Sequence, residues 1–265
     1  MKRHWYEGFI GFRYLRASPR RGFVSLIAGI AIAGLALGVA VLIVVLSVMN
    51  GFEEVLRTRI LSLTAHATIS GIDGRIANWR ADITKLQSFP GINGVAPYIE
   101  EQGLLTHADK SSGVQLRGIT PEAEARVVDL GPHLLSGRLS DLVPGSYRVI
   151  LGKALAEELG VKLGDRVVLI VALGDVTPLG VIPRMRAFEV VGILSVGMYE
   201  YDRRIAVTAM QDAAKLLRMG DDVTGIRLNL KDMYAAPHIS RAAALAIGGG
   251  VEIQDWTNED RKSVV

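Results

Sequence analysis

The chain has 265 residues, a formal net charge of +3 at neutral pH and no cysteine, and 49% of its residues are hydrophobic. The lack of cysteine excludes disulfide bonds and thiolate metal sites. The excess of positive charge comes from the first 21 residues, where six basic residues stand against one acidic residue. The remainder is nearly balanced, so the composition indicates contact with anionic lipid and not with nucleic acid.

Residues 1–21 are expected to form a cytoplasmic stub. Trp5, Phe9 and Phe12 share one helical face with basic residues beside it, which is typical of a short helix lying on a membrane surface. A disordered arm is the alternative interpretation of this segment.

An uncharged and mostly apolar run occupies residues 22–52. A helix needs about 20 apolar residues to cross a bilayer core of roughly 30 Å, so this run predicts a transmembrane helix. Basic residues before it and a balanced set after it favour a cytoplasmic N-terminus and a large extracytoplasmic part. A cleaved signal peptide is the alternative, but its apolar core normally has about 7–15 residues.

Within this run, Gly34 and Gly38 form a pair of small residues four positions apart, a spacing that lets another transmembrane helix pack closely. An ordinary membrane-helix composition would also produce such a pair. Residues 53–65 keep apolar residues at helical spacing with charges between them. We therefore expect the helix to continue as a stalk that carries motion to the following domain.

Residues 66–258 alternate strand and helix patterns, which predicts an α+β domain. We expect a membrane-proximal lobe of residues 66–120 and 200–258, a distal lobe of residues 121–199, and a tail at 259–265. The expected strands are His66–Ser70, Gly94–Thr106, Gly113–Ile119, Arg148–Leu151, Arg166–Leu173, Met185–Leu194, Arg204–Thr208, Gly225–Leu230 and Val251–Trp256. The expected helices are Ile76–Ser88, Pro121–Asp129, Lys153–Leu159, Met210–Arg218 and Met233–Ala246.

The sequence contains none of the motifs G-x-x-x-x-G-K-[ST], G-x-S-x-G and H-E-x-x-H. Its five histidines lack the spacing of metal ligands, so no metal site is expected. No catalytic residue is expected either. We interpret the chain as a protein that anchors, binds or transmits force.

The segment GDVTPLGVIPRM lies between two expected strands, those that end at Leu173 and begin at Met185. Pro178 and Pro183 each lack a backbone donor and fix φ near −65°. The segment is expected to project as a stiff, non-pairing loop with apolar residues near its tip. Exposed apolar residues on such a loop favour a docking site, and an ordinary hairpin loop is the alternative.

Several segments resemble the membrane subunits of the lipoprotein-releasing ABC transporter, the Lol C/E family. They are FIGFRYLRA at 9–17, the run at 23–61 with LSVMNGF at 46–52, LGKALA with the glycines that follow at 151–165, TPLGVIPRMRAF at 177–188, and VTGI with DMY at 223–234. The third is shared with macrolide-exporter and cell-division permeases, whose two-lobed periplasmic domain is the implied fold. The fourth is similar to the C type and the fifth to the E type, which suggests a hybrid subunit serving both roles as a homodimer. The resemblance covers residues 5 to about 257.

This resemblance implies a subunit of the bacterial inner membrane that extracts lipoproteins and hands them to a periplasmic carrier for the outer membrane. The implied partners are a cytoplasmic ATPase dimer, a second permease subunit that is identical or related, the carrier, the lipoprotein and membrane lipid. ATP and magnesium would be bound by the partner ATPase and no cofactor by this chain, which accounts for the missing P-loop.

The resemblance assigns carrier docking to the protruding hairpin of the family, called the hook. Its residues here are Thr177, Pro178, Leu179, Gly180, Val181, Ile182, Pro183, Arg184 and Arg186. Arg186 stands where the family has a basic residue that supports docking, and Arg184 is its neighbour.

If the chain transports lipoproteins, their lipid chains are expected to contact the outer end of the first span at Leu42, Val45, Leu46 and Met49. Ordinary lipid-facing positions are the alternative for these four residues. Two other functions compete with transport: a related scaffold of the cell-division type that regulates a periplasmic hydrolase, and an unrelated receptor that binds a small ligand between its lobes.

No second apolar run of spanning length follows residue 52. The family has four spanning helices, with the periplasmic domain between the first two. We therefore expect the sequence to be a fragment of a longer subunit, and a naturally truncated chain is the alternative.

Overall fold

The computed structural model describes residues 22–61, 65–177, 180–255 and 263–264, together with the single residues 6, 10 and 13. For residues 22, 24, 25, 53–61, 173–177, 180–182 and 263–264 it describes the backbone alone. The chain divides into two compact units, Met1–Thr58 and Arg59–Val265.

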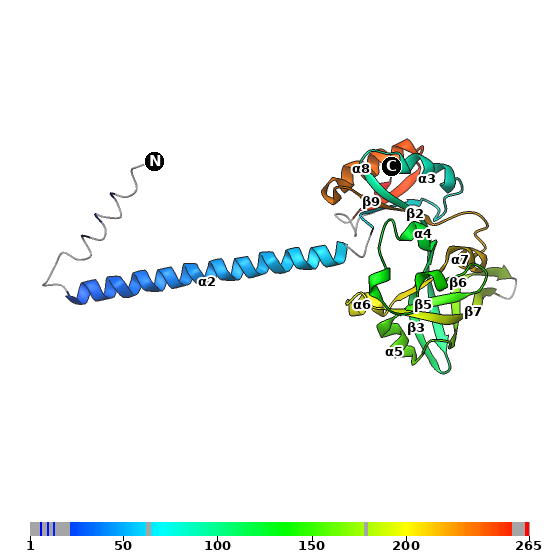
Figure 1. Ribbon diagram of the computed structural model, residues 1–265, viewed down its shortest axis with the longest axis horizontal. Helices are drawn as coiled ribbons and strands as arrows, with labels where there is room; N and C mark the ends of the chain where they lie inside the picture. Colours follow the sequence, from blue (N-terminus) through cyan, green and yellow to red (C-terminus); the bar gives the residue numbers. More distant parts are fainter. Residues whose placement is uncertain are drawn as a thin grey trace. The chain divides into compact units, whose positions relative to one another are not determined.

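The first unit is dominated by helix α2 (Gly22–Leu61), which has 40 residues and no break at Gly51 (Figure 1). Residues Leu26–Phe52 are long and apolar enough to cross a membrane. At 1.5 Å per residue they span about 40 Å, more than a hydrocarbon core of about 30 Å. The helix therefore has the length to cross with tilt and continue beyond the lipid, as the sequence predicts.

The second unit is built on one continuous sheet. Its strands are β1 (Ala67–Gly71), β2 (Ile92–His107), β3 (Lys110–Ile119), β4 (Leu134–Ser136), β5 (Arg148–Gly152), β6 (Arg166–Thr177), β7 (Gly180–Leu194), β8 (Ile205–Ala209), β9 (Gly225–Leu230), β10 (Val251–Asp255) and β11 (Ser263–Val264). They follow the order β11-β10-β1-β9-β2-β3-β8-β5-β7-β4, and β6 pairs with both β2 and β7.

Because β6 joins β7 back to β2, six strands form a closed ring: β2, β3, β8, β5, β7 and β6. Strand β2 is long enough to pair with two neighbouring strands along one of its edges. Its first half pairs with β9, and residues Gly103–Thr106 pair with β6. The sheet thus runs from the ring into the layer of β9, β1 and β10 without interruption, and the predicted lobe boundaries stay a prediction.

Helices cover this sheet (Figure 1). Helices α3 (Trp79–Gln87) and α8 (Ala236–Ala246) lie on the layer of β1, β9 and β10, while α5 (Lys153–Leu159) and α7 (Met210–Leu217) pack on the ring. In α7, the apolar residues Ala213, Leu216 and Leu217 are buried at helical spacing. Ring strand β7 supplies the core residue Phe188, which is 1% exposed. Full burial of such a side chain stabilises the fold by about 1.5–3 kcal/mol.

The α+β class is confirmed, and each expected strand corresponds to an observed one with ends shifted by a few residues. The expected helix at Pro121–Asp129 is wrong in length, because α4 (Pro121–Glu124) ends after four residues. The helix expected from Ile76 begins at Trp79, since Ile76 makes a β-bridge with Val223. The short elements β4 and α6 (Tyr199–Asp202) were not expected from the sequence.

One histidine makes the stability of this unit depend on pH. Nδ1 of His66 accepts a hydrogen bond from the backbone N–H of Leu230 at 3.0 Å. Burial lowers the pKa of His66 below its usual 6.5. The unfolded chain therefore takes up the proton first, so the stabilisation is present above pH 6.5 and is lost as pH falls through the lowered pKa.

We expect the wild-type chain to lose thermal stability between pH 7.5 and pH 5, and His66→Gln to lose less over the same interval. Thermal unfolding followed by circular dichroism at both pH values measures the difference. An equal fall in Tm for the two proteins would assign the pH dependence to other groups.

Candidate functional site

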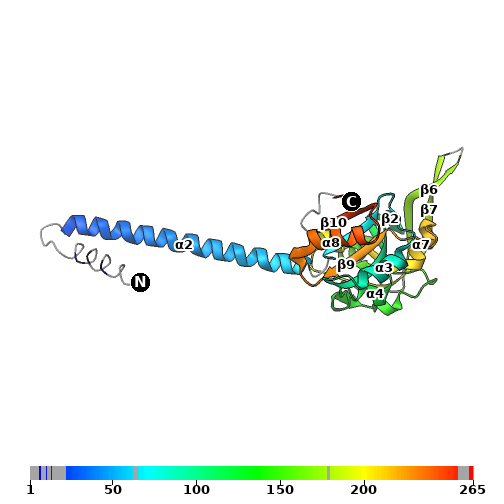
Figure 2. The ribbon, with the colours of Figure 1, turned by 90° about the horizontal axis from the view of Figure 1, so that it is seen from above.

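The clearest candidate site is the hairpin of β6 and β7, here called the hook where it extends past Val171. Strand β6 leaves β2 after Val171, so from that residue onward β6 and β7 have only each other as partners. Figure 2 shows this arm projecting from the body of the second unit.

The expectation of a non-pairing loop between these strands is wrong. Cross-strand pairs continue through Asp175 with Ile182 and Val176 with Val181 to Thr177 with Gly180. Only residues 178–179 lie between the strands, and they fall outside the described residues.

The position of Pro183 explains how a proline is accommodated in a paired strand. The register shifts between Val171, which pairs with Arg184, and Asp175, which pairs with Ile182. Residues 172–174 therefore face Pro183 alone. Such bulges leave backbone groups outside the regular ladder, so the missing N–H of proline costs no pairing.

The base of the hook is tied to helix α7 by Arg184. Its Nη1 donates a hydrogen bond to the carbonyl oxygen of Leu217 at 2.7 Å. Leu217 is the last residue of α7, where carbonyl groups lack partners within the helix and carry partial negative charge. This half-buried arginine therefore joins the hook to the end of α7.

Arg186 lies against an aromatic ring at the same base. Its guanidinium carbon is 4.2 Å from the ring centroid of Tyr147, and its Nη2 donates to the Tyr147 hydroxyl at 2.8 Å. Tyr147 in turn meets Phe188 edge to face, with ring centroids 5.7 Å apart. This packing fixes the plane of the guanidinium group while Arg186 stays exposed.

Tyr147 is held in place by a buried carboxylate. Asp212, in the first turn of α7, accepts hydrogen bonds from the backbone N–H groups of Gly145 at 2.7 Å and Tyr147 at 2.9 Å. Tyr147 has a φ of 52°, a left-handed conformation that costs an aromatic residue about 1 kcal/mol or more. Neither Asp212 nor Tyr147 is predicted from the sequence, because no local sequence pattern indicates the role of either residue.

The remaining predicted site residues are placed as follows. Pro183 is exposed, and for Thr177, Gly180, Val181 and Ile182 the backbone alone is described. On α2, Leu42, Val45, Leu46 and Met49 share one helical face and are exposed. Added Cβ atoms at Gly34 and Gly38 would meet nothing within 4 Å, so both glycines leave room for a neighbouring helix. The lipid-contact and helix-packing roles stay predictions.

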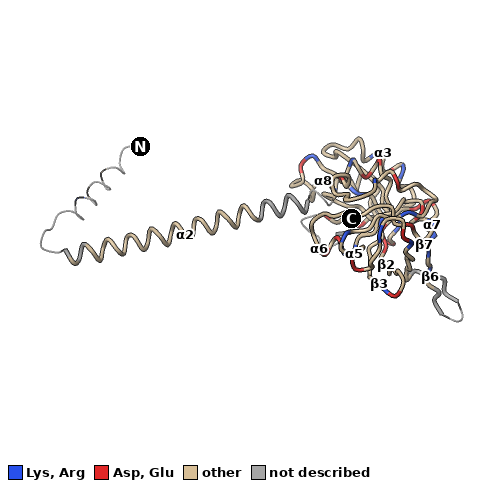
Figure 3. The backbone as a smooth tube through the Cα atoms, turned by 60° about the horizontal axis from the view of Figure 1, so that its bottom comes forward, with Lys and Arg blue, Asp and Glu red and all other residues tan. Residues whose placement is uncertain are grey.

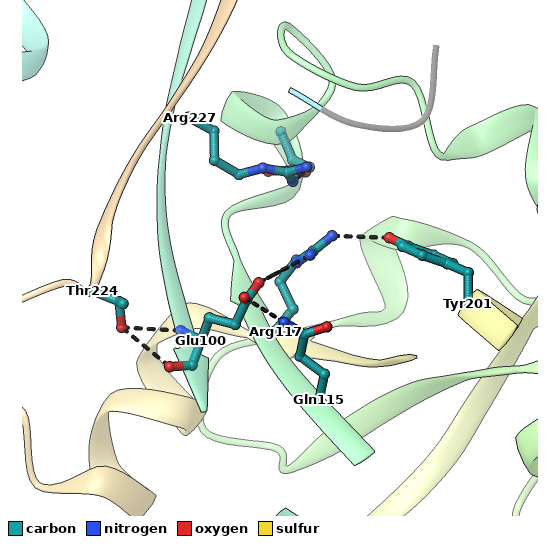
Figure 4. A network of polar contacts seen from close by, with 7 residues as sticks. Glu100, Gln115, Arg117, Tyr201, Thr224 and Arg227 are labelled. Atoms are coloured by element: carbon teal, nitrogen blue, oxygen red, sulfur yellow. Dashed lines mark hydrogen bonds and ion pairs between the residues drawn. The ribbon is translucent and has the colours of Figure 1, made fainter. Parts of the chain in front are cut away.

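A network of partly buried charges lies where the ring meets the layer of β9 (Figure 4). Arg117 on β3 contacts Glu100 on β2 at 2.9 Å, and its Nη1 donates to the Tyr201 hydroxyl at 2.9 Å. The hydroxyl of Thr224, next to β9, accepts from the backbone N–H of Glu100 at 3.0 Å. These contacts join residues of both parts of the sheet.

A second ion pair in this region is almost completely buried. The guanidinium of Arg227 on β9 binds the carboxylate of Glu124 in α4, and their side chains are 5% and 0% exposed. The nearby Tyr98 phenol is also buried, which raises its pKa to about 12. Charged residues within otherwise apolar strands could have indicated that such a network exists. The sequence alone does not indicate which residues pair with them.

Among the residues that the structure describes, no group of three or more His, Cys, Asp or Glu side chains could hold a metal ion. The hook instead offers an exposed arm with a rigid base.

Comparison with known proteins identifies relatives of this chain. Residues 28–244 match the model of the MacB-like periplasmic core domain. The chain is 44% identical to the lipoprotein-releasing system transmembrane protein LolC of Neisseria meningitidis, covering 96% of this chain and 62% of the relative. It is 42% identical to LolC of Xylella fastidiosa, over 95% of this chain and 60% of the relative. It is 30% identical to LolE of Haemophilus influenzae, over 95% of this chain and 61% of the relative.

Two solved structures are also similar to this chain over part of its length. The periplasmic region of MacB from Actinobacillus actinomycetemcomitans aligns with a TM-score of 0.48 and 18% identity, over 76% of this chain and 94% of that one. The extracellular domain of the transporter YknZ aligns with a TM-score of 0.47 and 15% identity, over 67% of this chain and 90% of that one. The LolC relatives and the family model confirm the resemblance to the Lol C/E subunits, and the chain spans about 62% of the length of the Neisseria relative.

Proposed function

Because the chain belongs to the family of the MacB-like periplasmic core domain, we propose that it is part of an ABC transporter subunit that releases lipoproteins from the inner membrane. Its second unit would lie in the periplasm and pass the lipoprotein to a soluble carrier. The LolC relatives, which are transmembrane proteins of a lipoprotein-releasing system, support this proposal with 44% and 42% identity over nearly the whole chain. The observation that carries it is the projecting hook with its anchored base.

The roles of the described residues follow from their positions. Helix α2 is a continuous rod of 40 residues, so a displacement at one end is transmitted to the other. The hook holds the carrier, and Arg184 and Arg186 keep its base rigid through Leu217 and Tyr147. A rigid arm loses little conformational entropy on binding, which favours capture.

The proposed partners would bind ATP and complete the transporter. A cytoplasmic ATPase would bind ATP and magnesium, since the chain has no phosphate-binding loop. A second permease subunit, identical or related, would complete the transporter. The exposed glycine pair Gly34 and Gly38 on α2 is a suitable surface for a neighbouring transmembrane helix.

Photocrosslinking tests the docking role directly. A photoreactive residue at position 182 of the full chain, in nanodiscs, is expected to crosslink to the purified carrier from the same genome. The matched control is position 135, because Leu135 is also apolar and is 61% exposed on β4, away from the hook. No crosslink from position 182, or equal yields from both positions, would contradict the proposal.

A further inference from the structure

A cavity of about 390 Å³ lies between helix α3 and the turn that joins α8 to β10, and is here called the α3 cavity. Helix α3 lines it with Asp82 and Lys85, which share one face of the helix because they are three positions apart. Arg75, in the turn that follows β1, lines it as well. Figure 3 shows both basic and acidic positions along α3. The α3 cavity therefore offers charged groups of both signs.

Asp82 is the unusual member of this set, because it is only 9% exposed. In the part of the chain that the structure describes, no hydrogen bond or ion pair reaches its carboxylate. Burial raises its pKa above the usual value. Buried charged side chains are almost always paired, since an unpaired charge loses the stabilisation that water gives. A cationic group that enters the α3 cavity would supply the missing partner.

The wall of the cavity opposite α3 is formed largely by backbone. Gly249 and Gly250 line it, with φ values of 67° and 69°. This left-handed conformation favours glycine, and the lack of side chains keeps that side of the cavity open. An added Cβ at Gly250 would meet nothing within 4 Å. The open wall leaves space for a small ligand beside the charged groups.

The backbone at Arg75 is fixed by a tight turn. An added Cβ at Gly71 would lie 1.9 Å from the carbonyl oxygen of Arg75, so the chain folds back closely there. The next residue, Ile76, exchanges two backbone hydrogen bonds with Val223, at 2.8 and 3.1 Å. Nη1 of Arg75 lies 3.9 Å from Asp222, which is too long for a hydrogen bond. The guanidinium group can therefore bind an anionic group while its backbone stays in place.

We propose that the α3 cavity binds a small zwitterion, whose primary ammonium group pairs with Asp82 and whose phosphate or carboxylate group pairs with Arg75. A simple anion would be repelled by Asp82, and a simple cation by Arg75 and Lys85. A ligand that carries both charges therefore matches the cavity best. The headgroup of phosphatidylethanolamine and free phosphoethanolamine share this chemistry. The inference goes beyond the proposed function and does not depend on the hook.

The test uses the full chain in phosphatidylcholine nanodiscs, with phosphoethanolamine as the probe and calorimetry as the measurement. Phosphocholine, which has no N–H group for Asp82, and inorganic phosphate are each expected to bind about tenfold more weakly than phosphoethanolamine. Asp82→Asn keeps the shape of the side chain and removes its charge, so it should weaken phosphoethanolamine binding about tenfold. It should also stay folded, because it removes an unpaired buried charge. Asp109→Asn is the matched control, since Asp109 is exposed between β2 and β3 and outside the cavity.

Three results would overturn the proposal: no binding of phosphoethanolamine, equal affinity of wild type and Asp82→Asn for it, or equal affinity of the wild type for it and for inorganic phosphate. Nanodiscs made with phosphatidylethanolamine distinguish the two sources of the ligand. Weaker binding of the free probe there assigns the cavity to the lipid headgroup, and unchanged binding assigns it to a free zwitterion. The variant Pro178→Glu with Ile182→Glu should bind the probe as wild type does, so failure of hook docking leaves this proposal standing.

Discussion

Charged residues at the tip of the hook are expected to abolish capture of the carrier. The proposed variant is Pro178→Glu with Ile182→Glu in the full chain. Burial of an isoleucine side chain contributes about 1.5–3 kcal/mol, and a buried unpaired carboxylate adds a further penalty. Affinity should therefore fall at least a hundredfold, measured by calorimetry with purified carrier.

The control for this variant places the same charge elsewhere on the domain. Leu135 and Leu163 are exposed apolar residues outside the hook, with exposed fractions of 61% and 49%. Leu135→Glu with Leu163→Glu is expected to leave carrier affinity unchanged. Equal affinity of the tip variant and this control would show that the hook tip is not the docking site.

Arg227→Ala is expected to cause the largest loss of stability. The substitution leaves the carboxylate of Glu124, which is 0% exposed, without its cation. The second carboxylate oxygen of Glu124 already has no hydrogen-bond partner among the described residues. Removing one partner of a buried pair typically costs about 3–5 kcal/mol, and we expect a loss of that size in urea unfolding.

An exposed ion pair provides the matched control. Arg80 binds Asp221 through two contacts, and their side chains are 62% and 71% exposed. Arg80→Ala should cost about 0–1 kcal/mol, because water screens such pairs. The double variant Arg227→Met with Glu124→Leu removes both buried charges and should recover most of the lost stability. A loss below about 1 kcal/mol for Arg227→Ala would contradict the account of a critical buried pair.

The position of this pair suggests why it matters for function. Arg227 lies on β9, outside the ring, while the Arg117–Glu100 pair belongs to ring strands β3 and β2. Ion pairs between elements that are far apart in the sequence favour one arrangement of those elements, because separating them leaves a charge without its partner. The network thus joins the ring that carries the hook to the adjoining layer.

Patterns of neighbouring residues in the sequence predicted most of the helices and strands. The spanning helix follows from an uncharged run, and helix α7 from apolar residues at helical spacing. Strand β4 has only three residues, too few for a periodic pattern. The closed ring depends on β6 pairing with β2, a contact between residues more than 60 positions apart, which no local pattern indicates.

The sequence was less informative about the candidate site. Two prolines indicated a projecting segment but led to the wrong expectation of an unpaired loop, since the bulge opposite Pro183 is set by the register of both strands. The base of the hook depends on Asp212 and Tyr147, which are 65 positions apart. Glu124 and Arg227 are 103 positions apart. Such pairs form only when the fold brings their strands and helices together.

Transfer of a lipoprotein to its carrier would show whether the hook tip is needed for release. The subunit that contains this chain would be reconstituted with its ATPase in proteoliposomes loaded with labelled lipoprotein. Wild type and the Leu135→Glu, Leu163→Glu control are expected to transfer label to the carrier when ATP is added, and the Pro178→Glu, Ile182→Glu variant to transfer little. Undiminished transfer by the tip variant would contradict the account.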